Sequence, residues 1–501
     1  MNVLMRESKM VKRVVIAGGG TAGWMTAAAI SKLIGKHLDV RLVESDAIGT
    51  VGVGEATIPT LHVFHQLLGL KESEVMAATN ATFKLGINFE SWHDVGKDYL
   101  HSFGYPGKDC WAAGFQHFWR RGLDLGIDHE IGDYCFEHLA AREERFAVQT
   151  NRDRNYAYHL DATQYAKYLR AFAERHGVTR IEGKIESVQL DPQSGDISAL
   201  ALDSGERLEG DLFIDCTGFR ALLIEGALHT GYLDWTHWLP CDRALAVQTT
   251  SEGEPVPYTR SIAHESGWQW QIPLQNRVGN GLVYCSRYLD DDAAKQLLLN
   301  NISGETLTEP RAIKFRTGTR RKHWNKNCVA IGLSSGFIEP LESTSIHMIQ
   351  RSIIRLLQLF PTNGCKAADI EEFNRQTSAE IETIRDFIVL HYHVTDRQDS
   401  SFWRYCRSMP IPDSLQHRLD LFEQRGHVFK QAGELFGESS WIQVIVGQGV
   451  IPKEYHPIVD MMSDGELKDF LDTIRNQTRH QVAKLPKHAD FVAHYCKTGM
   501  S

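Results

Sequence analysis

The stretch Lys12-Arg-Val-Val-Ile-Ala-Gly-Gly-Gly-Thr-Ala-Gly-Trp24 carries the strongest fold signal in the chain. Its apolar run, Val14 to Ala17, predicts a short buried strand. Gly18, Gly20 and Gly23 follow with the spacing G-x-G-x-x-G, which lets a backbone turn approach a pyrophosphate at the start of a helix. This spacing alone is a weak signal, so the flanking sequence decides its meaning.

The sequence after the glycines has the pattern that a nucleotide site requires. Met25 to Leu33 predicts a helix, and Val40 to Val43 predicts a second apolar strand. That strand ends in Glu44, whose carboxylate suits a pair of ribose hydroxyls. Strand, glycine turn, helix, strand and acid in this order predict a Rossmann-type dinucleotide-binding unit and an α/β fold.

Composition narrows the class of protein. At 501 residues the chain is too long for one compact domain. Its net charge of -9 argues against nucleic acid as a partner, and no run of 18 or more apolar residues predicts a membrane span. The charged Met1 to Lys12 segment does not resemble a signal peptide. The nine cysteines are scattered without a Cys-x-x-Cys pair, which favours reduced cytoplasmic thiols and predicts no metal site.

A second anion site is predicted in Gly336 to Ile346, just before an apolar helical pattern. Ser343 and Thr344 offer side chains for the helix N-cap. The free amides of Thr344 and Ser345 are a candidate anion site because they carry the positive end of the helix dipole. Glu342 either points into a cavity or is simply a favourable charge near a helix start.

Phe83 to Phe89 alternates in the manner of one strand, with Lys84 on the face opposite the aromatic residues. Lys84 therefore points into solvent or into a cavity, and solvent is the usual place for a strand lysine. His101 and Phe103 follow, and they either line an aromatic pocket or pack in a core.

The middle of the chain contains further strand and loop signals. Gly49 to Pro59 is glycine-rich and is expected to be an irregular loop that either contacts a cofactor or merely connects two elements. Arg180 to Val188 and Ile197 to Leu202 predict an antiparallel hairpin. Leu208 to Phe219 predicts a strand that returns to the nucleotide sheet. Trp268 and Trp270, two residues apart, share one face of a strand, where core packing is their commoner role.

Helical periodicity dominates the last third of the chain. It covers Ile370 to Tyr392, Leu415 to Leu435 and Asp464 to Ala483.

Four motifs follow one another along the chain in this order: Gly18-Gly-Gly-Thr-Ala-Gly-Trp24, Gly52-Val-Gly-Glu-Ala-Thr-Ile-Pro59, Gly267-Trp-Gln-Trp-Gln-Ile-Pro273 and Glu339-Pro-Leu-Glu-Ser-Thr344. Together they resemble the flavin-dependent tryptophan halogenase family, from Val11 to the C-terminus. The resemblance implies an FAD-binding Rossmann-type box related to aromatic hydroxylases, with an additional mostly antiparallel sheet and a pyramid of C-terminal helices. We expect an N-terminal extension at 1–10, an FAD-binding domain at 11–360 and a helical substrate-side region at 361–501.

The resemblance also implies roles for individual residues. Lys84 matches the catalytic lysine, Glu342 the catalytic glutamate, and Thr344 and Ser345 the residues whose amides hold halide. The expected substrate-pocket residues are His101, Phe103, Trp268, Trp270 and Trp441. The expected cofactor-binding residues are Gly18, Gly19, Gly20, Ala22, Gly23, Glu44, Ser45, Ile48, Glu55, Ala56, Ile185, Leu333 and Thr344.

Two departures from the family pattern concern halide and substrate. The family commonly has glycine where Ser345 stands, which puts halide affinity and choice in question. Tryptophan-specific members carry a Tyr-Tyr and Phe-Trp lid that grips the amino-acid part of tryptophan, and Asp420 to Trp441 lacks such a run.

The resemblance predicts an enzyme that uses FADH2, O2 and chloride or bromide to make hypohalous acid and halogenate an electron-rich aromatic, indole or an indole derivative. A separate NAD(P)H-dependent flavin reductase would supply FADH2. An FAD-dependent aromatic hydroxylase and a catalytically silent flavin-binding protein are the alternatives. A homodimer is an assembly that the sequence leaves open.

Overall fold

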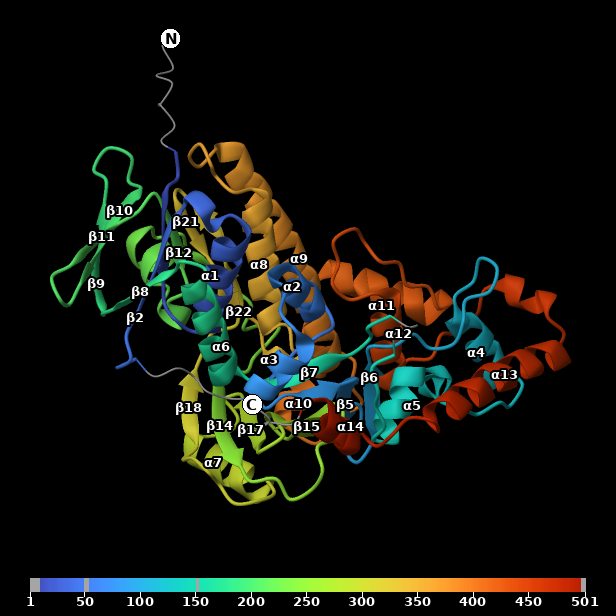
Figure 1. Cartoon of the computed structure of the whole chain (residues 1–501). Helices are drawn as coiled ribbons and strands as arrows, with labels where there is room; N and C mark the ends of the chain where they lie inside the picture. The colour runs from blue at the N-terminus through green and yellow to red at the C-terminus, as the bar shows by residue number, and fades with distance from the viewer. Residues whose placement is uncertain (1–9, 49–53, 150–152, 497–501) are drawn as a thin grey trace, which may run out of the picture.

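A parallel sheet built on the glycine fingerprint forms one side of the molecule (Figure 1). The computed structural model describes residues 10–48, 54–149 and 153–496. Central strand β1 (Arg13–Ala17) pairs in parallel with β2 (Asp39–Glu44) and β12 (Leu212–Asp215). The sheet continues to β8 (Thr179–Glu182) on one side, and to β21 (Cys328–Ala330) and the antiparallel β20 (Trp324–Asn325) on the other. The Rossmann-type fold is confirmed. Of the single strand predicted over 208–219, residues 212–215 return to this sheet as expected, whereas 208–209 belong to a separate small sheet.

Helix α1 (Thr21–Leu33) follows the glycine turn and packs against α2 (Leu61–Leu68), α6 (Ala162–Arg175) and α8 (Ser345–Gln358). The buried face of α1 consists of small and apolar residues from Gly23 to Ser31, which allows these close contacts. The short α3 (Glu72–Ala78) packs against α6. The N-termini of α1 and α8 thus belong to one packed layer, although their sequences lie more than 300 residues apart.

The second large sheet is mostly antiparallel, as predicted. Its order is β18 (Arg311–Lys314), β14 (Arg243–Thr249), β17 (Val278–Tyr284), β16 (Gly267–Pro273), β15 (Tyr258–His264), β5 (Gly86–Glu90) and β6 (Asp98–Ser102). Only the β15–β5 pairing among these described strands is parallel. Helix α7 (Asp291–Asn300) packs on β17 and β14.

Three smaller sheets complete the described β-structure. One, at the edge of the molecule in Figure 1, contains β9 (Ile185–Leu190), β10 (Ile197–Leu202) and β11 (Arg207–Glu209). Another joins β3 (Gly54–Ala56), β7 (Ala157–Asp161) and β4 (Thr82–Lys84). The third joins β13 (Tyr232–Asp234), β19 (Gly318–Arg320) and β22 (Gly336–Phe337).

Helices form the other lobe in Figure 1. The long α9 (Ala367–His393) contacts α8, α10 (Ser401–Ser408), α11 (Asp413–Arg425) and α12 (Glu438–Gly447), and so connects the lobe to the nucleotide layer. Helix α13 (Asp464–Val482) packs on α4 (Phe115–Asp124) and α5 (Phe136–Arg142), and α14 (His488–Tyr495) packs on β4. The sequence predicted α9, α11 and α13 but not α10, α12 or α14, and it placed the end of α11 at Leu435. That helix, α11, ends at Arg425 because Gly426 adopts a left-handed conformation.

The prediction of one strand over 83–89 is wrong in a way that matters for the site. The chain changes sheets at Leu85, whose amide donates to Pro257 O and whose carbonyl accepts from Phe103 N. Lys84 therefore ends β4 in one sheet while β5 begins the other, and the lysine is fully buried. The solvent alternative for Lys84 is wrong, because its ammonium group is buried against Thr57, Ser343 and the Phe103 ring.

Two other boundaries differ from the predictions. The segment 180–188 is split between β8 of the nucleotide sheet and β9 of the small sheet, since the chain leaves the parallel sheet at Gly183. Gly54–Ala56 is strand β3, although an irregular loop was predicted there. The rest of that loop, 49–53, and the N-terminal 1–9 lie outside the described residues.

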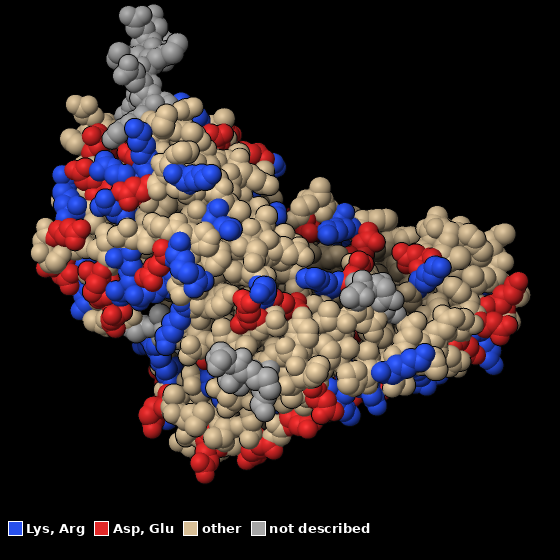
Figure 2. Space-filling model, in the orientation of Figure 1, with Lys and Arg blue, Asp and Glu red and all other residues tan. Residues whose placement is uncertain are grey.

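The surface drawn in Figure 2 carries acidic and basic side chains interspersed with one another. Within the described residues, no helix combines the length and apolarity needed to cross a membrane. The same described part of the chain contains no cluster of histidine, cysteine or acidic side chains arranged to hold a metal ion.

Candidate active site

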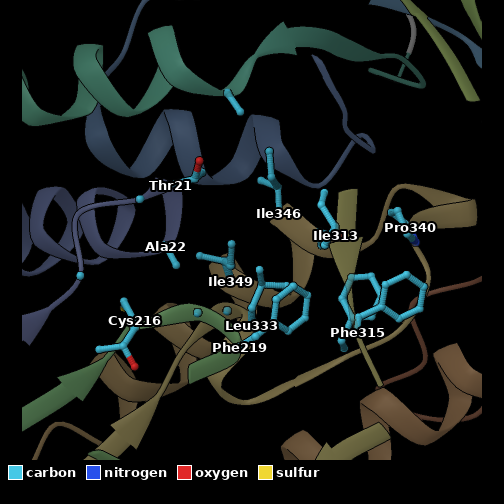
Figure 3. Close-up of a pocket in the computed structure, with 18 of the residues that line it drawn as sticks. Thr21, Ala22, Cys216, Phe219, Ile313, Phe315, Leu333, Pro340, Ile346 and Ile349 are labelled. Carbon is cyan, nitrogen blue, oxygen red and sulfur yellow. The ribbon is translucent and has the colours of Figure 1, made fainter. Parts of the chain in front are cut away.

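A cavity of about 840 Å³ lies where the N-termini of α1 and α8 approach the antiparallel sheet. Figure 3 shows Thr21, Ala22, Ile346 and Ile349 from these helices facing the space that Phe315 and Ile313 border from the sheet side. Most of the expected cofactor residues line this cavity: Gly18, Gly19, Gly20, Ala22, Glu44, Ser45, Ile48, Glu55, Ala56, Ile185, Leu333 and Thr344. Gly23 does not, and it instead packs α1 against Gly18 O.

The glycine end of the cavity fits a dinucleotide. Gly18 has a φ of 107°, and a β-carbon there would lie 2.3 Å from Cys216 O, so only glycine allows this turn. Gly20 is the N-cap of α1 and makes no side-chain cap, which leaves helix-start amides available to a pyrophosphate. Glu44 lies at the expected ribose position, but Arg180 Nε already donates to its Oε1 over 2.6 Å.

Glu55 is a carboxyl group in the wall of the same cavity. It stands on β3, the short strand that the sequence did not predict. Burial raises the pKa of Glu55 to about 7. The cavity therefore contains an acid whose charge near neutral pH responds to what binds beside it.

The turn before α8 joins this cavity to a second group of buried side chains. Ser343 has a φ of 60°, and Thr344 is the N-cap of α8 without a side-chain cap bond, so the predicted capping by Ser343 and Thr344 hydroxyls is wrong. The hydroxyl of Ser343 instead accepts a hydrogen bond from Lys84 Nζ over 2.8 Å. Ser343, Thr344 and Ser345 line the cavity, and the first amides of a helix have no intrahelical acceptor.

Lys84 is held without a direct acidic partner. Its ammonium nitrogen donates to Ser343 Oγ and, over 3.1 Å, to Thr57 O, and it lies 5.2 Å from the centre of the Phe103 ring. Burial lowers the pKa of Lys84 to about 7, although the charge of Glu342 acts in the other direction. Lys84 can therefore act both as a proton donor and as a free amine near neutral pH.

Glu342 ends the 3-10 turn Pro340–Glu342 and is 1 % exposed. His101 Nδ1 lies 3.0 Å from both of its oxygens, and His391 Nε2 lies 2.9 Å from Oε1 in ion-pair contact outside ideal hydrogen-bond alignment. Burial acts to raise the pKa of Glu342, but His101 and His391 hold it down, at about 2. Glu342 is thus a buried carboxylate, and the alternative of a mere helix-start charge does not explain its histidine partners.

The tryptophan pair forms a wall of the cavity. Trp268 and Trp270 on β16 are buried with ring centres 6.0 Å apart, and both line the nucleotide cavity. Trp268 Nε1 donates over 2.9 Å to Glu339 Oε2, which also accepts from the Tyr392 hydroxyl of α9. Burial raises the pKa of Glu339 to about 7. Glu339 therefore ties the wall to α9, next to the turn that bears Glu342.

The expected pocket residues His101 and Trp441 lie outside the lining of the nucleotide cavity. With Phe387 and Phe436, which were not expected in the pocket, they form what we call the aromatic cluster. Phe103, the remaining expected pocket residue, faces Lys84. The Phe436 ring stacks on Phe387 at 3.8 Å between ring centres, and Trp441 meets Phe387 edge-on at 4.8 Å. His101 lies 5.7 Å from the Phe387 ring and joins this cluster to Glu342.

The family model described as tryptophan halogenase matches residues 13–464. The chain belongs to the tryptophan halogenase family. A flavin-dependent halogenase from Xanthomonas campestris superposes with a TM-score of 0.97 at 59% identity, covering 98% of this chain and all of that one. The flavin-dependent halogenase BrvH from Brevundimonas sp. BAL3 gives 0.93 at 45% identity, over 96% and 99% of the two chains. Tryptophan 7-halogenase RebH from Lentzea aerocolonigenes is 32% identical over 97% of this chain and 99% of its own length.

The protein is therefore a flavin-dependent halogenase, an oxidoreductase that uses FADH2 and a halide. The cavity agrees with this chemistry, because its glycine turn and two helix N-termini suit a dinucleotide and a small anion.

Sequence reasoning missed several residues of the candidate site. His391 and Tyr392 contact the two acids of the turn, and Ser343 binds Lys84. A histidine and a tyrosine near the end of an apolar helical pattern gave no signal beyond burial. Phe436 was overlooked because it lies in the irregular segment between α11 and α12.

Proposed function

We propose that this halogenase transfers a halogen to the electron-rich carbon of an indole, with Lys84 and Glu342 as its catalytic residues. When bound, reduced FAD and O2 supply the oxidising equivalent that turns halide into hypohalous acid. The halide would lie at the amides of Thr344 and Ser345, where α8 begins and the cavity lining is formed.

The observation that carries this proposal is the arrangement around Ser343. Ser343 lines the nucleotide cavity and also accepts a hydrogen bond from Lys84, which does not line that cavity. An oxidised halogen formed at the Thr344 and Ser345 amides would thus have to travel only past this turn to reach Lys84. Trp268 and Trp270 keep the aromatic substrate apart from the flavin end of the cavity.

Lys84 and Glu342 together account for every proton and electron pair in the halogen transfer. Lys84 either hydrogen bonds to hypohalous acid or captures the halogen on its amine, and in both cases the oxygen leaves as water. The carbon–halogen bond forms from the ring electrons, which leaves the ring cationic. Glu342 then accepts the proton from the same carbon, and the electron pair of the broken C–H bond restores the aromatic ring. A buried carboxylate also stabilises the cationic ring before the proton leaves.

Free indole or an indole carried by a larger molecule is the proposed substrate, in place of free tryptophan. The charged side chains at Trp441 pair with each other, since Arg418 lies 4.1 Å over the Trp441 ring and donates to Glu434. A second bond reaches Glu434 from the Gln431 amide. These groups are occupied, so they offer no ready partner for the ammonium and carboxylate of an amino acid.

A separate NAD(P)H-dependent flavin reductase is proposed as the source of FADH2. The family resemblance carries this proposal. The nine cysteines, all in the described ranges, are free thiols, which favours a reducing compartment such as the cytoplasm. The division into an FAD-binding part at 11–360 and a helical part at 361–501 is also a proposal, and α9 of the second part contributes His391 and Tyr392 to the site.

One assay tests the function. The purified protein is incubated with FAD, a flavin reductase, NADH, O2 and indole, with chloride and bromide supplied separately, and the products are read by mass. Halogenated indole that depends on the halide supplied supports the proposal. Hydroxylated indole without halide dependence would instead establish the hydroxylase alternative, and hydrogen peroxide alone would establish a catalytically silent flavin protein. Lys84→Ala is the matched control, since it should still bind FAD and make peroxide.

A further inference from the structure

His391 is a fully buried histidine whose ring faces Glu342, the base of the proposed function. It stands near the end of α9, two residues before the helix ends at His393. Its ring packs on Phe89 at 4.7 Å and on Trp92 at 6.1 Å between ring centres. These apolar contacts fix the ring, so its nitrogen atoms have defined partners.

The partners of His391 indicate two ring protons. Its Nδ1 lies 2.8 Å from Phe387 O, and a carbonyl only accepts, so Nδ1 carries a hydrogen. The other nitrogen, Nε2, lies 2.9 Å from Glu342 Oε1 in ion-pair contact, although the two groups are not aligned as a hydrogen bond. A bare nitrogen lone pair this close to a carboxylate would be repelled in a site without water, whereas an N–H there is attracted. Both ring nitrogens of His391 therefore face an oxygen that can only accept, which is the arrangement an imidazolium satisfies.

His101 faces the same carboxylate but has different surroundings. Its Nδ1 donates to Glu342, while its Nε2 is buried without a hydrogen-bond partner among the described residues. A proton on that Nε2 would be an unsatisfied buried donor, which costs roughly 1–3 kcal/mol. His101 therefore has a partner at only one ring nitrogen, whereas both ring nitrogens of His391 face an acceptor.

The remaining groups near Glu342 do not replace the charge of an imidazolium. Lys84 on β4 has a pKa lowered to about 7 by burial, and Tyr99 on β6 has a pKa raised by burial, so it stays neutral. Gln448, the C-cap of α12, donates from its neutral side-chain amide to the backbone oxygen of His391. The residues of the β5 side that touch His391, Phe89 and Trp92, are uncharged.

We propose that His391 is a positioning residue that remains an imidazolium through the reaction and keeps Glu342 oriented and ionised until the substrate ring becomes cationic. The proposal rests on the proposed function, because it takes Glu342 as the group that accepts the ring proton. His391 itself does not exchange that proton, since both of its nitrogens are already protonated. Its effect reaches the substrate only through the carboxylate.

Substituting His391 should therefore change the pH dependence of turnover. In His391→Gln the counter-charge is lost while burial still acts to raise the pKa of Glu342. We expect kcat at neutral pH to fall with little change in KM, and the acid limb of the kcat–pH profile to move up by roughly one pH unit or more. Raising the pH should restore part of the activity, whereas a general loss of packing would lower kcat equally at every pH.

His393→Gln is the matched control. His393 lies on the same helix, is half-buried, and its Nδ1 faces Cys406 O across 3.3 Å, not Glu342. Its pH profile should coincide with that of the parent enzyme. A His391→Gln profile that also coincides with the parent profile, in a variant that binds FAD normally, would overturn the proposal.

A second measurement needs no turnover. Histidine-selective 13C and 15N labelling of the intact protein, with the His391 signal assigned from its absence in His391→Gln, reports whether that ring is an imidazolium. We expect the charged form across the neutral range in the parent protein and its loss in Glu342→Gln. A neutral His391 in the parent protein would overturn the proposal. If instead Glu342→Gln turned over like the parent enzyme, the proposed role of Glu342 would fail, and the NMR result would still decide the charge of His391.

Discussion

Lys84 Nζ donates to Ser343 Oγ over 2.8 Å, which joins segments 259 residues apart in sequence. The lysine ends a strand at a change of sheets, and the serine adopts a left-handed conformation just before a helix. Neither segment alone makes a site, since one brings the amine and the other brings the cavity-lining amides of Thr344 and Ser345. The end of β4 and the turn before α8 therefore meet at this one hydrogen bond.

Replacing Lys84 should stabilise the protein while it abolishes halogenation. The pKa of the buried amine is lowered to about 7, so the unfolded chain binds a proton more readily between that pH and its ordinary value. The stability of the parent protein should consequently rise with pH across this window. Lys84→Met removes the free-energy cost of burying the amine. The Tm of this variant should therefore exceed that of the parent protein at neutral pH, and the difference in Tm should shrink as pH rises.

Thermal unfolding of both proteins at several pH values, with flavin binding and product formation as companion assays, checks this. Lys71→Met is the control, since Lys71 is exposed and should leave the pH dependence unchanged. Halogenation near the parent rate in Lys84→Met would remove the lysine from the mechanism.

Glu342→Gln should keep the shape of the site and lose most of the turnover. The amide cannot accept the ring proton, and removal of a general base commonly lowers the rate by about 10²- to 10⁴-fold. Single-turnover rates on indole, measured with saturating bromide, give the size of the loss. A loss of roughly tenfold or less would return Glu342 to the role of a structural carboxylate.

Glu380→Gln provides the comparison for that variant. Glu380 is also buried and accepts a hydrogen bond from His347 Nε2 over 3.1 Å. Burial acts to raise the pKa of Glu380, but His347, Arg355 and Arg351 lower it to about 2. It pairs with Arg355 and lies among the helices of the nucleotide layer, apart from Lys84. This variant should lose thermal stability but keep its rate per folded molecule.

The sequence predicted the parts of the fold that depend on local pattern. Gly18 and the strands on either side of its helix follow from spacing and from the need for a left-handed turn, so this unit was predicted correctly. The break at Leu85 could not be predicted, because it depends on hydrogen bonds to Pro257 and Phe103 that come from distant strands. A single alternating run looks the same whether it stays in one sheet or divides between two.

The candidate site divides in the same way. Lys84 and Glu342 were predicted from motif context, whereas the place of His391 depends on which face of a long helix meets the 339–342 turn. Periodicity in 370–392 indicated burial but not the partner. The predicted N-cap roles of Ser343 and Thr344 failed because Lys84 already takes the Ser343 hydroxyl. Tertiary contacts decided these roles, and local propensity did not.

Acid should destabilise the contact between α4 and the chain around α11. His117, His427 and His456 form a histidine cluster with ring centres 4.9 to 6.0 Å apart. Burial and these two neighbours lower the pKa of His117 to about 4. The unfolded chain therefore takes up a proton at a higher pH than the folded one, and the stability falls as pH drops from about 6.5 to about 4.

Urea unfolding between about pH 4 and pH 6.5 measures how steeply the free energy of unfolding depends on pH. His117→Phe should make this dependence weaker, while His37→Phe, at an exposed position, should leave it unchanged. An unchanged slope in His117→Phe would show that other buried histidines account for the acid sensitivity.

Indole should be a better substrate than free L-tryptophan. The ring needs only apolar and stacking contacts, which the aromatic cluster supplies. Tryptophan also brings an ammonium and a carboxylate, and burial of an unpaired charge costs several kcal/mol. Arg418 and Glu434 neutralise each other beside Trp441, so neither is free to bind those groups. Without a grip on the amino-acid part, ring electronics set the site of attack, which favours C3 of indole.

Initial rates on indole and on L-tryptophan under one halide, with the products assigned by NMR, test this preference. Glu434→Gln adds a second arm, since it should leave Arg418 unpaired and lower the KM for L-tryptophan while changing that for indole little. Arg425, exposed and paired with Glu454, offers Glu454→Gln as the control. The parent enzyme could instead clearly prefer L-tryptophan and substitute only its benzo ring. Another segment would then bind the ammonium and carboxylate of the substrate, and the pairing of Arg418 with Glu434 would not determine substrate choice.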